Sequence, residues 1–242
     1  MVKLAIPALL AGLLAAPLTH AGNVGATLTV DQLQLQGSGN YTVQPDNRKL
    51  YSRIVNVDTY KDIAEWAIDK DSWQPVATNA QHNGSQAQGG WNPLAGGGGL
   101  AVDMAEGDGA WRSGESSLWT DILLNLAPGA SVTVSGRLQL AFHDSSAGGA
   151  KSSGFAGICL DLSPAACEPD YKRGSTLGAE PGGFSDSFSL GWHNDTAYNQ
   201  QLLWRTQLMV DALSPVPEPA NWGMLGAGLG LLGLCRKRYR SG

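Results

Sequence analysis

The chain has 242 residues, with 16 Lys or Arg and 21 Asp or Glu, which gives a net charge of −5 at pH 7. An acidic chain is a poor candidate for binding nucleic acid, where affinity comes largely from neutralised phosphates. It is equally unsuited to simple adhesion to anionic lipid. The length allows one domain with a sizeable hydrophobic core.

The first 21 residues have the three parts of a secretory signal peptide. Lys3 supplies a positive start, residues 4–16 form an apolar stretch, and the segment ends at Thr19, His20 and Ala21. We expect signal peptidase to cut after Ala21, at this small-residue end. A permanent N-terminal anchor is the alternative, but it would need a longer apolar run. The remaining body, residues 22–214, keeps 11 basic and 20 acidic residues, a net charge of −9.

Alternation of apolar and polar residues with period two predicts that this body is all-β. Its clearest run is residues 131–142, in which every inward position except Gly136 is apolar. Residues 118–126 alternate in the same way, and the Ala-Pro-Gly-Ala turn at 127–130 predicts that the two runs form a hairpin. A final strand, 204–212, leads into the C-terminal tail. Weaker strands are expected at residues 26–30, 32–35, 50–57, 154–162 and 185–192.

Such short strands separated by turns predict a β-sandwich of jelly-roll or immunoglobulin-like type. Two segments interrupt the pattern. Asp58 and Thr59 favour a short helix over residues 60–70 with Trp66 facing inward, although a loop crossing one end of the sandwich fits the same residues. Residues 79–114 are rich in Gly, Gln, Asn and Ser and predict a long loop.

Acidic residues in this loop are a candidate calcium site. Asp103, Glu106 and Asp108 offer oxygen ligands at short spacing, as calcium requires, but not at the spacing of an EF-hand. A solvated acidic turn is the simpler interpretation. No catalytic sequence motif is present, and the body histidines are isolated from one another in sequence: His82, His143 and His193.

The body also contains seven tryptophans. Trp91 and Trp111 flank the glycine-rich segment and are candidates for stacking on sugar rings, with partial burial beneath the loop as the alternative. Trp119, Trp192 and Trp204 fall in strands and are expected in the core. Cys159 and Cys167, eight residues apart, predict a disulfide in an oxidising compartment. No C-x-x-C spacing supports a redox or nucleophilic role for either cysteine.

The C-terminal residues 215–242 carry three parts in a fixed order. The triplet Pro217, Glu218 and Pro219 predicts a stiff, extended stretch. An uncharged run of 16 residues, 220–235, follows. As a helix it would rise roughly 24 Å and could span a thinned bilayer. A basic cluster that favours the cytoplasmic side closes the chain: Arg236, Lys237, Arg238 and Arg240.

This tail resembles a PEP-CTERM sorting signal. The resemblance covers residues 215–240, about a tenth of the chain, and implies nothing about the body. It implies a Gram-negative bacterium that makes extracellular polysaccharide, a precursor anchored in the inner membrane, and cutting by exosortase. A buried core helix is the alternative, but a core helix rarely ends in a cluster of cations.

These observations favour a non-catalytic protein of the cell surface or the extracellular polysaccharide matrix of a biofilm. Its expected partners are signal peptidase, exosortase and the inner membrane. Extracellular polysaccharide is a further candidate partner, and nucleic acid is not expected to bind. No cofactor is expected, with calcium as the alternative. The rival hypothesis is a secreted carbohydrate-active hydrolase, or a carbohydrate-binding protein, with a calcium-braced loop. A hydrolase would require two carboxylates, or an acid and a histidine, in one cleft.

Overall fold

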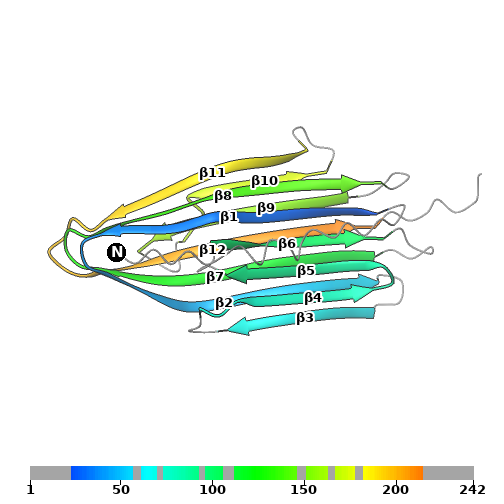
Figure 1. Cartoon of the computed structure of the whole chain (residues 1–242), viewed down its shortest axis with the longest axis horizontal. Coiled ribbons are helices and arrows are strands. Elements are labelled where there is room, and N and C mark those ends of the chain that lie inside the picture. The colour runs from blue at the N-terminus through cyan, green and yellow to red at the C-terminus, as the bar shows by residue number, and fades with distance from the viewer. Residues whose placement is uncertain are drawn as a thin grey trace, which may run out of the picture.

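A computed structural model of the chain describes residues 23–56, 61–69, 73–92, 96–105, 112–145, 151–162, 167–177 and 182–214. In these residues, two six-stranded antiparallel sheets stack face to face in a sandwich-like fold without helices (Figure 1). The all-β prediction is confirmed. The expected signal peptide and C-terminal tail lie outside the described residues. Nothing in the described part of the chain is a helix able to cross a membrane.

The two sheets are named here by their strands in spatial order. Sheet A consists of β11 (Gly183–His193), β8 (Ser131–Asp144), β1 (Val24–Ser38), β6 (Gly97–Met104), β5 (Ser85–Asn92) and β4 (Val76–His82). Sheet B consists of β10 (Tyr171–Thr176), β9 (Lys151–Asp161), β12 (Gln200–Leu213), β7 (Arg112–Leu126), β2 (Tyr41–Asn56) and β3 (Lys61–Asp69). The hydrophobic core lies between them.

The core contains the apolar faces that the alternation predicted. In β8 the side chains of Val132, Val134 and Leu138 are buried against sheet B. In β12 the buried positions alternate regularly from Trp204 to Ala212. Burying one face of each strand removes apolar surface from water at about 25 cal/mol per Å², and this burial drives the two sheets together.

The predicted hairpin between β7 and β8 is wrong, because the two strands belong to opposite sheets. β7 is paired with β2 on one side and β12 on the other, so neither of its edges is free. The turn 127–130 therefore crosses from sheet B to sheet A. Asn194 fastens it: its backbone carbonyl accepts from Gly129 N at 2.7 Å, and its Nδ2 donates to the carbonyl oxygen of Leu126 at 3.0 Å.

The predicted helix over residues 60–70 is also wrong, since residues 61–69 form the edge strand β3. The backbone of β3 satisfies the hydrogen-bonding groups along the open edge of β2, which a helix would leave unpaired. The Asn79 backbone N–H, on β4 in sheet A, donates to the Glu65 carboxylate. Ile63 and Ala67 pack against the core, whereas Trp66 points outward.

The predicted loop 79–114 contains two complete strands, β5 and β6. In β5 the inward positions are Ser85, Ala87, Gly89 and Trp91, so small residues conceal the alternation. The turn between β4 and β5 is Asn83-Gly84, with φ of 46° and 80°. Asn-Gly is a strong sequence signal for a tight hairpin turn, and it identifies this hairpin.

Both ends of the body emerge at one end of the sandwich. Val24, at the start of β1, pairs with Met104, the last residue of β6. Ser214, just after β12, donates its backbone N–H to the Arg112 carbonyl oxygen at 2.8 Å, at the start of β7. β6 leads directly to β7 along the chain, so these two pairs lie at the same end (Figure 1).

Gly89 offers a test of the packing between the sheets. A Cβ at this position would lie 2.7 Å from Leu50 Cδ1 and 2.9 Å from Leu100 Cδ2, both of them in the core. We expect Gly89→Ala to lower the free energy of unfolding by about 1–3 kcal/mol through overpacking. Urea denaturation followed by circular dichroism measures the change.

Gly191→Ala is the matched control, because its Cβ would meet neighbours only at 3.6 Å or more. Equal stability of Gly89→Ala and Gly191→Ala would contradict the close apposition of β5 and β2.

Candidate functional site

Sheet B exposes large hydrophobic side chains on its outward face. Trp66 is 58% exposed and Ile68 57%, both on the edge strand β3. Trp119 on β7 is 38% exposed, and Met209 on β12 is 37% exposed. Apolar groups gathered on one exposed face of a domain usually mark a binding surface.

Cross-strand register places these residues in two adjacent rows. In the first row Trp66 is opposite Tyr51, Tyr51 is opposite Ser117, Ser117 is opposite Met209, and Met209 is opposite Phe155. We call these residues the aromatic row. The rings of Trp66 and Tyr51 are in contact, with centroids 3.9 Å apart and planes tilted by 34°. The row therefore crosses five strands, from β3 to β9.

The second row lies two residues further along each strand. It reads, from β3 to β10, Ile68, Lys49, Trp119, Gln207, Gly157 and Lys172. We call it the lysine row, and the two rows together the aromatic face. Neighbouring strands are about 4.8 Å apart, so rings on alternate strands are separated by roughly 10 Å, on the order of the length of a disaccharide.

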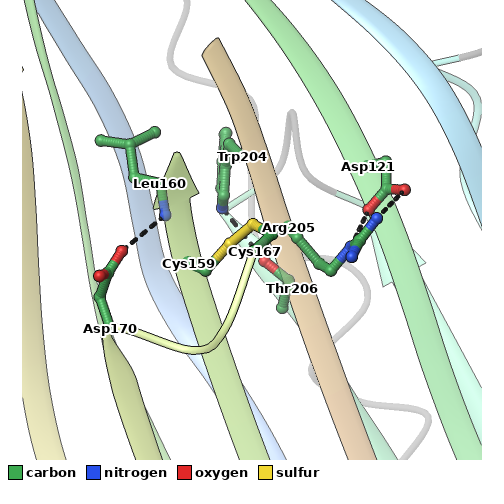
Figure 2. The surroundings of a disulfide bond; sticks show 8 residues. All are labelled: Asp121, Cys159, Leu160, Cys167, Asp170, Trp204, Arg205 and Thr206. Carbon is green, nitrogen blue, oxygen red and sulfur yellow. Dashed lines mark hydrogen bonds and ion pairs between the residues drawn. A yellow bond between two sulfur atoms is a disulfide. The ribbon is translucent and has the colours of Figure 1, made fainter. Parts of the chain in front are cut away.

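Arg205 fixes the ring of Trp119. The guanidinium carbon lies 4.4 Å from the ring centroid, a cation–π contact. Arg205 is held in turn by Asp121: Nε donates to Oδ1 at 2.8 Å and Nη2 donates to Oδ2 at 3.0 Å (Figure 2). The two side chains are 14% and 8% exposed, so this bidentate pair is largely shielded from water.

A disulfide-linked segment borders the aromatic face on the Arg205 side. Cys159 on β9 forms a disulfide with Cys167, with Cα atoms 6.0 Å apart. The bridge lies over the outward face of sheet B (Figure 2). Both cysteines pack with Leu203 and Leu123. Asp170, beyond Cys167, accepts a hydrogen bond from Leu160 N at 2.9 Å. A loop this short contributes roughly 2–3 kcal/mol in the chain-entropy model.

Charged residues border the opposite side of the aromatic row. Glu115 on β7 is opposite Arg53 on β2 and opposite Asp211 on β12. Arg53 Nη2 lies 2.8 Å from an oxygen of Asp62, and Asp211 accepts from the Ser153 hydroxyl. Burial raises the pKa of the neighbouring Tyr51 phenol, with the Glu115 carboxylate adding to the rise, so the ring stays neutral at physiological pH.

The structure corrects one expectation in each set of tryptophans and confirms that Trp204 is buried in the core. Trp91 is fully buried in the core, so its predicted role in stacking on sugar is wrong. It takes an inward position of β5, on the same face as Ala87 and Gly89. Trp119 was expected in the core but is exposed. Trp111 lies outside the described residues.

The acid and histidine candidates come together only in part. His143 Nε2 lies 3.3 Å from Asp103 Oδ1, and Asn23 Nδ2 donates to Asp103 Oδ2 at 3.3 Å. His193 pairs with Ser131 at the other end of β8, about 40 Å of strand away from His143. Glu106 and Asp108 lie outside the described residues. Among the residues that the structure does describe, no three His, Cys, Asp or Glu side chains gather as metal ligands.

Sequence reasoning did not identify the aromatic face. Tyr51, Met209 and Phe155 occupy outward positions of strands whose existence was predicted. What unites them is the pairing order of β3, β2, β7, β12 and β9, which the sequence did not supply. The chain matches no family model, no curated protein and no solved structure.

Removing Arg205 should destabilise the protein strongly. Arg205→Ala leaves the Asp121 carboxylate buried without its cation, so we expect a loss of about 3–5 kcal/mol in the free energy of unfolding. Urea denaturation measures the loss, and tryptophan fluorescence of the native state reports the change around Trp119.

Arg53→Ala is the matched control, because its ion pair with Asp62 is exposed and should contribute less than about 1 kcal/mol. If the double variant Arg205→Met, Asp121→Leu is as unstable as Arg205→Ala alone, the unpaired carboxylate is not the cause.

Proposed function

We propose that this chain is an exported, non-catalytic protein of the cell surface or extracellular matrix that binds polysaccharide on its aromatic face. One observation carries the proposal: Trp66, Tyr51, Met209 and Phe155 share a row on the outward face of sheet B, next to Trp119. A row of this kind on an exported domain suits a ligand with matching apolar surface.

Sugar chains have that kind of surface together with hydroxyl groups. A pyranose ring presents a face of C–H groups that stacks on an aromatic ring, while its hydroxyl groups need hydrogen-bonding partners. Lys49 and Gln207 flank Trp119 in the lysine row and provide such partners. The aromatic row crosses five strands and the lysine row six, which suits an extended polymer better than a small molecule that needs an enclosing pocket.

The two chain ends account for delivery. The signal peptide directs export, and the tail with Pro217, Glu218 and Pro219 is the substrate of exosortase, with Arg236, Lys237, Arg238 and Arg240 stopping transfer at the inner membrane. The body begins and ends at one end of the sandwich. A tail anchored in the membrane therefore leaves the outward face of sheet B at the side of the molecule, open to the matrix.

Aromatic substitutions test the binding site. Trp66→Ala and Trp119→Ala should each weaken binding to a soluble exopolysaccharide about tenfold or more, which corresponds to a loss of about 1.4 kcal/mol or more in binding free energy. Affinity electrophoresis of the purified mature protein in polysaccharide gels measures the change.

Tyr198→Ala is the control, because Tyr198 is 80% exposed yet lies at the turn between β11 and β12. Binding that survives replacement of both tryptophans excludes the aromatic face as the site.

The same samples are assayed for new reducing ends, which would reveal hydrolysis of the polysaccharide. Their appearance in the wild type and loss in Glu115→Gln would replace the non-catalytic proposal by a hydrolase that uses the neighbouring Glu115 and Asp211.

Mass spectrometry tests the processing of the tail. In a strain with active exosortase, we expect the mature protein to begin near Gly22 and to lack the segment that runs from Trp222 to Arg240. Deletion of the exosortase should restore the mass of this segment. A mature species that retains Trp222–Arg240 although exosortase is active would exclude the proposed sorting.

A further inference from the structure

We propose that the polysaccharide bound by the aromatic face is acidic, and that Lys49 and Lys172 recognise its anionic groups. This inference rests on the proposed function and specifies its ligand class. A repeating carboxylate, as in a uronic acid polymer, is the simplest such group. The lysines lie in the lysine row directly beside the rings that would stack on the sugar backbone.

The two rows have a charge opposite to that of the chain. The protein carries a net charge of −5. The aromatic row and the lysine row together contain two lysines and no carboxylate. An acidic protein that binds an acidic polymer needs a local positive surface to offset the repulsion, and these rows provide one.

Both lysines are free to bind an anion. Lys49 and Lys172 are exposed, and within the described residues no carboxylate lies within ion-pair distance of either ammonium group. The Lys172 ammonium lies 5.7 Å from the ring centroid of Phe155, so it is positioned over the end of the aromatic row. The neighbouring arginines are already neutralised, Arg53 by Asp62 and Arg205 by Asp121.

The acidic groups near the aromatic face restrict where an anionic polymer can lie. Glu115 and Asp211 border the aromatic row on the side away from the lysines. A polyanion is therefore repelled from one side of the row and attracted to the other. Lys49 on β2 and Lys172 on β10 are four strands apart, about 19 Å, so the two lysines contact anionic groups several sugar residues apart on one extended chain.

Matched polymers separate the contribution of charge from that of the sugar backbone. Polygalacturonate and its methyl ester have the same backbone, with and without carboxylates. We expect the wild-type protein to bind polygalacturonate at least tenfold more tightly than the ester, with a preference that declines as salt rises. The double variant Lys49→Gln, Lys172→Gln should bind both polymers with the affinity that the wild type shows for the ester.

Lys151→Gln is the matched control, because Lys151 is exposed on β9 of the same sheet but lies outside both rows. It should keep the preference. Equal binding of the two polymers by the wild type, or an unchanged preference in the double lysine variant, overturns this inference while the proposed function stands. If the wild-type protein binds neither polygalacturonate nor its methyl ester, the proposed function itself is contradicted.

A second arm separates polysaccharide from a membrane surface. Vesicles of phosphatidylglycerol present anionic headgroups above an apolar layer, to which Trp and Lys side chains also bind. We expect no association of the mature protein with these vesicles, because Glu115 and Asp211 would be pressed against the anionic surface. Vesicle binding that requires both Trp119 and Lys49 would overturn the assignment to polysaccharide.

Discussion

Cross-strand register in sheet B is the constraint on which both the core and the aromatic face depend. Side chains alternate along a strand, so the pairing that buries Leu50, Leu118 and Leu208 also turns Tyr51, Trp119 and Met209 outward. A slip of one residue in any strand would expose its core residues and bury its share of the row. Core packing therefore keeps the aromatic face in register.

The strands with large inward residues were predictable, and their partners were not. The alternation in β8 and β12 follows from burying one face of a strand, which any sandwich requires. The turn 127–130 fits a hairpin as well as a crossing between sheets, because its residues determine local backbone angles only. A hairpin with β8 would require a free edge on β7. Both edges of β7 are occupied by strands distant in sequence, β2 and β12, so the turn crosses between the sheets.

Trp91 and Trp66 were misassigned from the sequence, each for a different reason. Ala87 and Gly89 fill inward positions of β5 without a strong apolar signal, so the sequence of this segment resembles a loop and predicts that Trp91 is exposed. An outward residue of β3 gave the opposite error: Trp66 was assigned to a buried helical face because apolar residues are usually inside, whereas it is 58% exposed. The proposed binding surface departs from this expectation, so the candidate site is where sequence reasoning was least accurate.

The two exposed tryptophans of the aromatic face are held by different forces. Trp119 lies in a strand paired on both sides, and Arg205 is fixed beneath it by the shielded Asp121 carboxylate. Trp66 lies on β3, which has a hydrogen-bonded neighbour on one side only and is retained by ring stacking on Tyr51 and by the Glu65 contact to β4. Fixing a side chain during folding lowers the entropy lost on binding. In the proposed complex with polysaccharide, Trp119 is therefore the preorganised contact, while Trp66 at the open edge can adjust to the shape of the polymer.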